Sequence, residues 1–115
     1  MNIRETLLTA KLKTETVNIK QLQQAVTIRE MDAKAFDQYE GMMFETDEAG
    51  EVVINSDNMK AKLIVSCVLD DDGELAFTPD DIDQINKMPG SIVKELAEAC
   101  AKISGIVPTD DVEKN

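Results

Sequence analysis

The sequence predicts an α+β fold that is predominantly α, with four to five helices and a small N-terminal antiparallel β-hairpin. Apolar residues recur at helical spacing in several segments, most clearly over residues 91–103. Two β-branched segments near the N-terminus alternate in the manner of strands. With 115 residues, 43% of them hydrophobic, the chain suits one folded domain. We expect a single domain over residues 1–106 and a flexible C-terminal tail over residues 107–115.

The N-terminal part changes from helical to strand periodicity near residue 13. Residues 1–12 place three apolar side chains on one face, as a short helix would. Residues 13–19 and 26–29 are rich in β-branched residues and alternate in polarity, and a short polar link joins them. We expect these two segments to pair as the antiparallel hairpin.

A second helix is predicted to begin after Asp32, whose side chain can cap the first turn, and to continue to about Phe44. Gly41 weakens this prediction because an interior glycine costs a helix about 1 kcal/mol relative to alanine. The polar residues 46–51 indicate a loop. Residues 52–54 are too few to assign to either structure.

The apolar segment that follows, residues 58–69, is compatible with two structures. Its apolar residues recur at four-residue steps, which predicts a helix capped by Ser56 or Asp57. Residues 63–69 alone could equally form a buried strand, although the residues before them favour the helix. Residues 70–73 then end the segment in a turn, which Gly73 suits by adopting a positive φ.

The C-terminal helices carry clear start and stop signals. Thr78 is placed to cap a helix with Pro79 at its first position, and the motif at residues 88–90 stops that helix. The last helix is predicted to run from about Ser91, with Gly105 just beyond its end. Its apolar stripe consists of Ile92, Val93, Leu96, Ala97, Cys100 and Ile103.

The charge is divided unevenly between the two parts of the chain. Residues 45–115 hold 17 acidic residues against 6 lysines, whereas residues 1–44 hold 6 of each sign. A net charge of -11 repels phosphate backbones and anionic lipid, so we expect neither nucleic acid nor membrane as a partner. A basic protein or a chain exposing apolar surface fits better. Alternatively, the acidic charge serves only to keep the protein soluble.

Residues that usually perform chemistry are scarce. There is no His, and Cys67 and Cys100 lie far apart in apolar segments, which is typical of reduced, buried thiols in a cytoplasmic protein. The turn at residues 70–74 resembles part of a calcium loop, but Val68 and Pro79 then occupy the first and twelfth positions, where the loop needs carboxylates. We therefore expect no catalytic residue, no cofactor and no metal, and a protein that is not an enzyme.

The candidate partner-binding residues are Met42, Met43 and Phe44, which precede an acidic loop. Methionine is unbranched and polarizable, so an exposed pair of methionines can adapt to varied apolar partners. The alternative is that these side chains fill the core.

The order and spacing of these segments resemble the tail assembly chaperones of long-tailed bacteriophages and prophages. The resemblance covers most of the chain, and no single motif in it is diagnostic. Where many relatives have Asn before the Gly-Leu that ends the last helix, this chain has Ser104-Gly105-Ile106. The segments that carry the resemblance are residues 13–19, 26–31, 58–70, 72–73, 77–82, 96–105 and 113–115.

The resemblance implies a non-enzymatic role in virion assembly in the host bacterial cytoplasm. Proteins of this family bind the tape measure protein, keep it soluble, help tail tube protein polymerise around it, and are absent from the mature virion. A longer product of translational frameshifting often accompanies them. We also expect self-association, because partners that line a long filament usually act in several copies. The residues expected to contribute to binding are Met42, Met43, Phe44, Asp70, Asp71 and Asp72.

Two other classes of function stay open on the sequence. An acidic inhibitor or DNA mimic would carry regularly spaced carboxylates and bind a basic enzyme in a salt-sensitive way. The acids of this chain instead cluster at helix caps and turns. A minor structural tail component would remain in purified virions.

Overall fold

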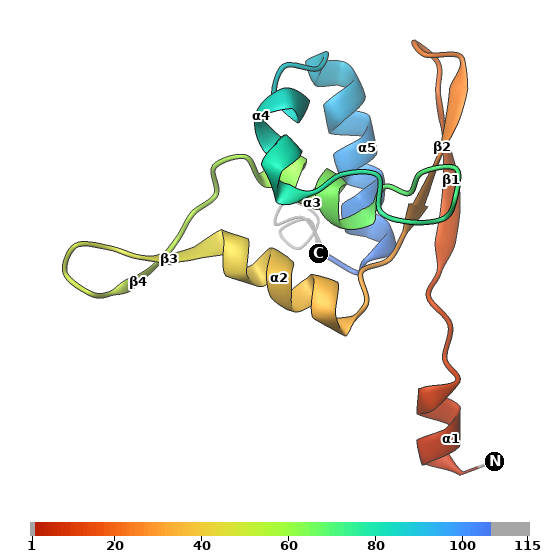
Figure 1. The fold of residues 1–115 in the computed structure, drawn as a ribbon, viewed down its shortest axis with the longest axis horizontal. Coiled ribbons are helices and arrows are strands. Elements are labelled where there is room, and N and C mark those ends of the chain that lie inside the picture. Colours follow the sequence, from red (N-terminus) through yellow and green to blue (C-terminus); the bar gives the residue numbers. More distant parts are fainter. Residues whose placement is uncertain (1, 107–115) are drawn as a thin grey trace, which may run out of the picture.

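Residues 2–106 are described by a computed structural model, and within them five α-helices, one 3-10 turn and two antiparallel hairpins form an α+β fold (Figure 1). The predicted fold class is confirmed. The predicted tail, residues 107–115, lies outside the described residues. No helix in the described part of the chain is long and apolar enough to cross a bilayer.

Helix α1 (Ile3–Leu8) stands apart from the other helices at the end of an extended segment (Figure 1). The Oδ1 atom of Asn2 caps it by accepting the N–H of Glu5 at 2.8 Å. The prediction that this helix reaches residue 12 is wrong, since it ends before Thr9. None of its side chains is buried, so no packing energy extends it beyond its own hydrogen bonds.

The predicted N-terminal hairpin is confirmed. Strand β1 (Thr14–Ile19) pairs antiparallel with β2 (Gln24–Arg29), with Ile19 opposite Gln24 at the turn. Alternation places Ile19 and Ile28 on the buried face, while most of their neighbours in the strands are exposed.

Helix α2 (Ala33–Met43) begins where the sequence predicts, because the Oδ1 of Asp32 accepts the N–H of Ala35 at 2.8 Å. A second hairpin, which the sequence did not predict, follows it. Strand β3 (Phe44–Thr46) pairs with β4 (Val52–Ile54), so Phe44 begins a strand and Thr46 ends one.

Helix α3 (Met59–Cys67) corrects two details of the prediction. Neither Ser56 nor Asp57 is its N-cap, a position held by Asn58 in the left-handed conformation with φ 60°. The helix ends at Cys67, since Val68 and the residue after it turn extended and form bridges to Ile28 and Leu75. The segment that the sequence left ambiguous is therefore a helix followed by a short extended stretch.

The C-terminal helices follow the sequence signals. A 3-10 turn (Pro79–Asp81) begins after Thr78, whose N–H donates to the Oδ2 of Asp81 at 2.8 Å. It continues into α4 (Ile82–Ile85), and α5 (Gly90–Ile103) follows. Gly105 takes φ 78° just past the end of α5, as its position predicted.

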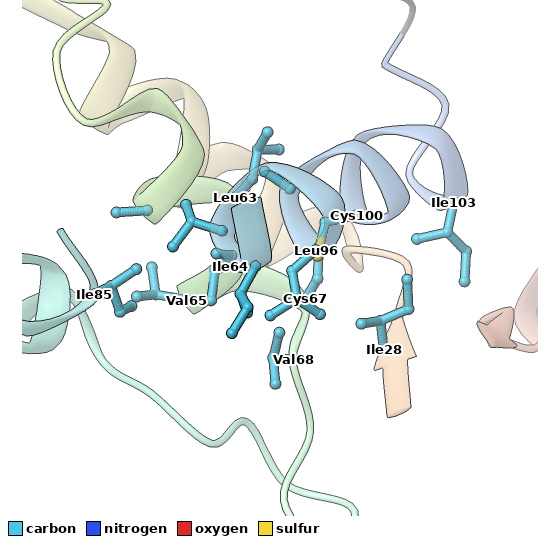
Figure 2. Packing of buried hydrophobic residues seen from close by; sticks show 14 of the residues in the cluster. Ile28, Leu63, Ile64, Val65, Cys67, Val68, Ile85, Leu96, Cys100 and Ile103 are labelled. Atoms are coloured by element: carbon cyan, nitrogen blue, oxygen red, sulfur yellow. The ribbon is translucent and has the colours of Figure 1, made fainter. Parts of the chain in front are cut away.

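The core is built around α3, where every residue from Ala61 to Cys67 is buried. This helix packs against α2 on one side and α5 on the other, and α5 in turn packs against β1 and β2. Figure 2 shows Ile64, Cys67 and Leu96 gathered at the centre of this packing. All six residues of the predicted α5 stripe are buried, as are the free thiols of Cys67 and Cys100.

Candidate partner-binding surface

The predicted apolar cluster divides between the core and the surface. Met42 and Met43, at the end of α2, are partly buried and packed against the core. Phe44, the first residue of β3, is 47% exposed. Of the three predicted residues, Phe44 is the one that offers a large accessible apolar side chain.

One face of the second hairpin is apolar and uncovered. Directly paired residues share a face of an antiparallel ladder, so Phe44 and its partner Ile54 lie on the same side as the pair of Thr46 and Val52. Ile54 is 70% exposed and Val52 is 72% exposed. The hairpin projects from the body of the molecule, away from α1 (Figure 1).

A buried lysine holds the base of this hairpin. The Nζ of Lys62 donates to the main-chain oxygen of Met42 at 2.8 Å and to that of Asn55 at 3.4 Å. The N–H of Asn55 also donates to the oxygen of Met43 at 2.6 Å. Sequence reasoning missed Lys62 because a lysine between apolar residues of a helix gives no signal of what its ammonium group reaches.

The predicted acidic residues lie in a turn that the side chain of Asp70 stabilises. The Oδ1 of Asp70 accepts the N–H groups of Asp72 and Glu74, at 2.8 and 3.1 Å. The tip of the second hairpin repeats this arrangement, since the Oδ1 of Asp47 accepts the N–H groups of Ala49 and Glu51, both at 2.9 Å. One carboxylate oxygen in each turn is thus occupied by the main chain.

The calcium-loop resemblance of the turn at residues 70–74 has no counterpart in the arrangement of carboxylates. Within residues 2–106, no group of three or more His, Cys, Asp or Glu side chains is placed to hold a metal ion. Asp71 and Asp72 are exposed and do not belong to a set of side chains that could bind a metal ion. The acids at residues 70–74 contribute negative charge to the surface.

A pocket of about 290 Å³ lies where the loop before α3 meets α4 and the start of α5. Its apolar lining includes Met59, which is 41% exposed, together with Met88 and Val93. On its polar side, the Nδ2 of Asn86 donates to the Oδ1 of Asn58 at 2.7 Å. Three separate segments build this pocket, which explains why sequence periodicity gave no sign of it.

Two helix starts border the pocket without side-chain caps. Asn58 makes no capping hydrogen bond to α3, and Pro89 makes none to α5. The first turns of both helices contribute residues to the lining, among them Ala61 and Gly90. Uncapped first turns favour hydrogen-bond acceptors. The pocket therefore suits an apolar side chain that has a polar acceptor beside it.

The structure brings some predicted residues together and separates others. Asn55 donates its N–H to the oxygen of Met43, and the next residue, Ser56, lines the pocket, whereas Met42, Met43 and Phe44 are not among the lining residues. The turn at Asp70 follows the opposite end of α3. A nine-residue helix is about 13 Å long, so the two predicted groups are not one cluster.

The two thiols meet inside the core, away from any surface. Both cysteines are fully buried, and the Sγ of Cys67 lies 3.6 Å from the Oγ of Ser104. A hydrogen bond with Cys67, together with burial, raises the pKa of the Cys100 thiol above its ordinary value. A protonated, enclosed thiol is a poor nucleophile, so Cys100 acts as a small core residue.

The sequence matches no protein-family model, and no curated protein matches it significantly. A solved structure described as that of the bacteriophage HK97 tail assembly chaperone does match, with a TM-score of 0.59. The match covers 87% of this chain and 95% of the other, at 16% sequence identity. The resemblance to tail assembly chaperones inferred from the sequence therefore extends to the three-dimensional structure, and this chain shares its fold with the HK97 chaperone.

Proposed function

We propose that this protein is a phage tail assembly chaperone that binds the tape measure protein, keeps it soluble, and promotes polymerisation of tail tube protein around it. The observation that carries the proposal is the fold shared with the HK97 tail assembly chaperone over nearly the whole of both chains. The chaperone works in the host cytoplasm and leaves before the virion matures.

The physical basis is the temporary covering of apolar surface. A client built of long amphipathic helices exposes an apolar stripe until assembly buries it, and such a stripe causes aggregation. The pocket beside Met59 and Met88 accepts apolar side chains of the client, and both methionines can adapt to different ones. The net charge of -11 keeps the complex soluble.

We assign the predicted residues different parts in this binding. Phe44 contacts the client, while Met42 and Met43 pack on the core at the end of α2, next to Phe44 in the chain. Asp71 and Asp72, in the exposed turn that follows α3, meet basic residues of the client. Asp70 shapes the turn that carries them, through the hydrogen bonds of its Oδ1.

Co-expression with the tape measure protein tests this surface. We expect the variant Phe44→Asp/Met59→Asp to leave the tape measure in the insoluble fraction, because two accessible apolar contacts are replaced by charges. Leu22→Asp, an exposed leucine at the β1–β2 turn, is the matched control and should keep the client soluble. Circular dichroism confirms that both variants fold. A client that stays equally soluble with the double variant would overturn the assignment of this surface.

A second measurement separates the chaperone from a structural tail component. Mass spectrometry of purified virions should detect the tape measure and tube proteins and should not detect this chain. A stoichiometric amount of this chain in mature virions would contradict the proposal and favour a structural role.

A further inference from the structure

We infer that the pocket between α3, α4 and α5 binds an acidic amphipathic helix of the client, which places an apolar side chain in the pocket and carboxylates beside three lysines that line or adjoin it. This binding rests on the proposed function, and it specifies the chemistry of the segment that the chaperone covers. The three lysines, called the pocket lysines below, are Lys60, Lys87 and Lys94.

Basic residues gather at this pocket. Lys60 is one of its lining residues. Lys87 lies in the chain between two lining residues, and Lys94 directly follows another. All three side chains are exposed, and no lining residue is acidic. The pocket therefore has a basic border, and its lining carries no negative charge.

The surrounding part of the chain has the opposite charge. Residues 45–115 contain 17 acids and 6 lysines, and three of those six are the pocket lysines. A fourth, Lys62, is buried and holds the base of the second hairpin. Asp57 is the one acid that directly adjoins a lining residue in the chain. The border of the pocket can thus attract carboxylates, although the protein as a whole repels them.

The apolar part of the pocket is pre-formed by the core. Ile85 and Val93, which line it, are 1% and 8% exposed. Met59 also lines it and is partly accessible, so its flexible side chain can adapt to the group that enters. The volume of about 290 Å³ lies at the lower end of the range for ligand sites, roughly 300–1,000 Å³. The pocket therefore suits one or two side chains of a larger partner.

An amphipathic helix presents apolar and charged groups in the required arrangement. Its residues three and four apart share a face, so apolar side chains can enter the pocket while acids beside them reach the pocket lysines. A basic helix with the same apolar face would meet like charges there, which opposes binding. The turn at Asp70 follows the other end of α3, so the basic residues assigned to it belong to another part of the client.

Two synthetic peptides of about 18 residues test the charge preference. Both have the same leucines spaced three and four residues apart, and the neighbouring positions are Glu in one peptide and Gln in the other. Fluorescence anisotropy with the purified full chain, at an ionic strength of about 0.05 M, should show the Glu peptide binding at least about threefold more tightly. The net charge of -11 acts against this result. Equal or weaker binding of the Glu peptide would overturn the inference.

Variants of the chain separate the charged from the apolar contribution. Lys60→Gln/Lys87→Gln should bring the two peptides to within about twofold of each other. The matched control, Lys20→Gln/Lys102→Gln, removes two exposed lysines elsewhere and should keep the preference. Met59→Gln should weaken both peptides by a similar factor, at least about threefold, because it removes an apolar contact. A preference that survives in the pocket variant, or is lost in the control, would contradict the role of the pocket lysines.

Salt and competing ligands check the nature of the occupant. Raising the ionic strength to about 0.5 M should reduce the difference between the two peptides, because exposed charges are then screened. A single-stranded oligothymidylate should not displace the Glu peptide, since it lacks the apolar side chains. Displacement would show that the site selects negative charge alone and would overturn the inference.

A second copy of the chain is excluded as the occupant by sedimentation velocity without peptide. The Lys60→Gln/Lys87→Gln variant should sediment as the unmodified chain does, whereas dissociation of this variant alone would mean that the pocket binds another copy. These measurements contain no tape measure protein. If they fail while the tape measure protein stays soluble on co-expression, the chaperone proposal stands and the acidic helix does not.

Discussion

The Nζ of Lys62 lies 2.8 Å from the main-chain oxygen of Met42 and also reaches that of Asn55, 13 residues further along the chain. One side chain of α3 therefore connects Met42, near the end of α2, with Asn55, the residue that follows β4. Lys62 is 5% exposed, so these hydrogen bonds are shielded from water. This ammonium group and the hydrogen bond from the N–H of Asn55 to the oxygen of Met43 together hold the base of the second hairpin.

Replacing Lys62 with Met should loosen the hairpin. The change keeps the length of the side chain but leaves two main-chain oxygens without their donor, at a cost of about 1–3 kcal/mol. The variant no longer buries a charge, and this offsets part of the cost in the free energy of unfolding. The decisive measurement is therefore a local one, made in the hairpin itself. Hydrogen exchange of the amides in residues 44–54 should become faster. Lys60→Met, at an exposed position on the same helix, should leave that exchange unchanged.

Glycine substitutions should have opposite signs in the turns and in α2. Gly50 and Gly73 have φ values of 84° and 82°, so Ala at either position should lower the unfolding free energy by about 1–2 kcal/mol. Gly41 lies in helical backbone with no heavy atom within 4 Å of an added Cβ. Gly41→Ala should therefore raise stability by about 0.5–1 kcal/mol. Urea unfolding measures all three, and equal effects would contradict the turn assignment.

In the acidic turn, Asp70 stabilises the fold and its neighbour Asp71 does not. Asp70→Ala removes an acceptor for two N–H groups and should cost about 1 kcal/mol or more in urea unfolding. Asp71→Ala touches an exposed side chain and should change stability by less than about 0.5 kcal/mol. If Asp71 meets the client, its substitution should instead lower the salt sensitivity of client binding. Equal destabilisation by the two variants would contradict the role given to Asp70.

The elements that sequence reasoning predicted well are those whose residues carry a complete local signal. The stripe of α5 recurs at helical spacing over 14 residues, and every stripe residue is buried. Strands β1 and β2 alternate over six residues each, which is long enough to distinguish them from a helix. Asp32 and Thr78 mark helix starts because their side chains and following residues are typical of caps.

The second hairpin was missed because its strands are too short to show a period. The information lay in its turn, since Asp47 to Glu51 and Asp70 to Glu74 share the pattern Asp-x-x-Gly-Glu. In both turns the Oδ1 of the aspartate accepts the same two main-chain N–H groups, and both glycines have positive φ. Recognising the repeated turn would have predicted that the chain reverses at residues 47–51 and that the flanking residues pair.

The candidate surface was predictable in part. Phe44 is exposed, which the sequence allowed but could not establish, and the pocket beside Met59 and Met88 was not foreseen. A pocket depends on how α3, α4 and α5 meet, which is set by tertiary packing. The extent of α1 was overestimated for the same reason, because apolar spacing predicts a helix without showing whether anything covers it.

Alkaline pH should destabilise the fold through the buried phenol of Tyr39. Burial, and secondarily the nearby Cys67, raises the pKa of Tyr39 above its ordinary value of 10.0. The hydrogen bond between the two thiols raises the pKa of Cys100 and lowers that of Cys67, so their contributions to stability oppose each other. The unfolded chain loses the proton of Tyr39 at lower pH than the folded chain does. The stability that Tyr39 contributes is present below about pH 10 and is lost as pH rises through its folded pKa.

Chemical unfolding at a series of pH values checks this dependence. The unfolding free energy should fall as pH rises above about 10, and Tyr39→Phe should reduce that slope. The phenylalanine variant keeps the ring that packs against Phe36 and removes only the titrating hydroxyl. Since Tyr39 rests on α2 beside the central helix, a slope that the substitution does not change would mean that the phenol is hydrated in the folded chain.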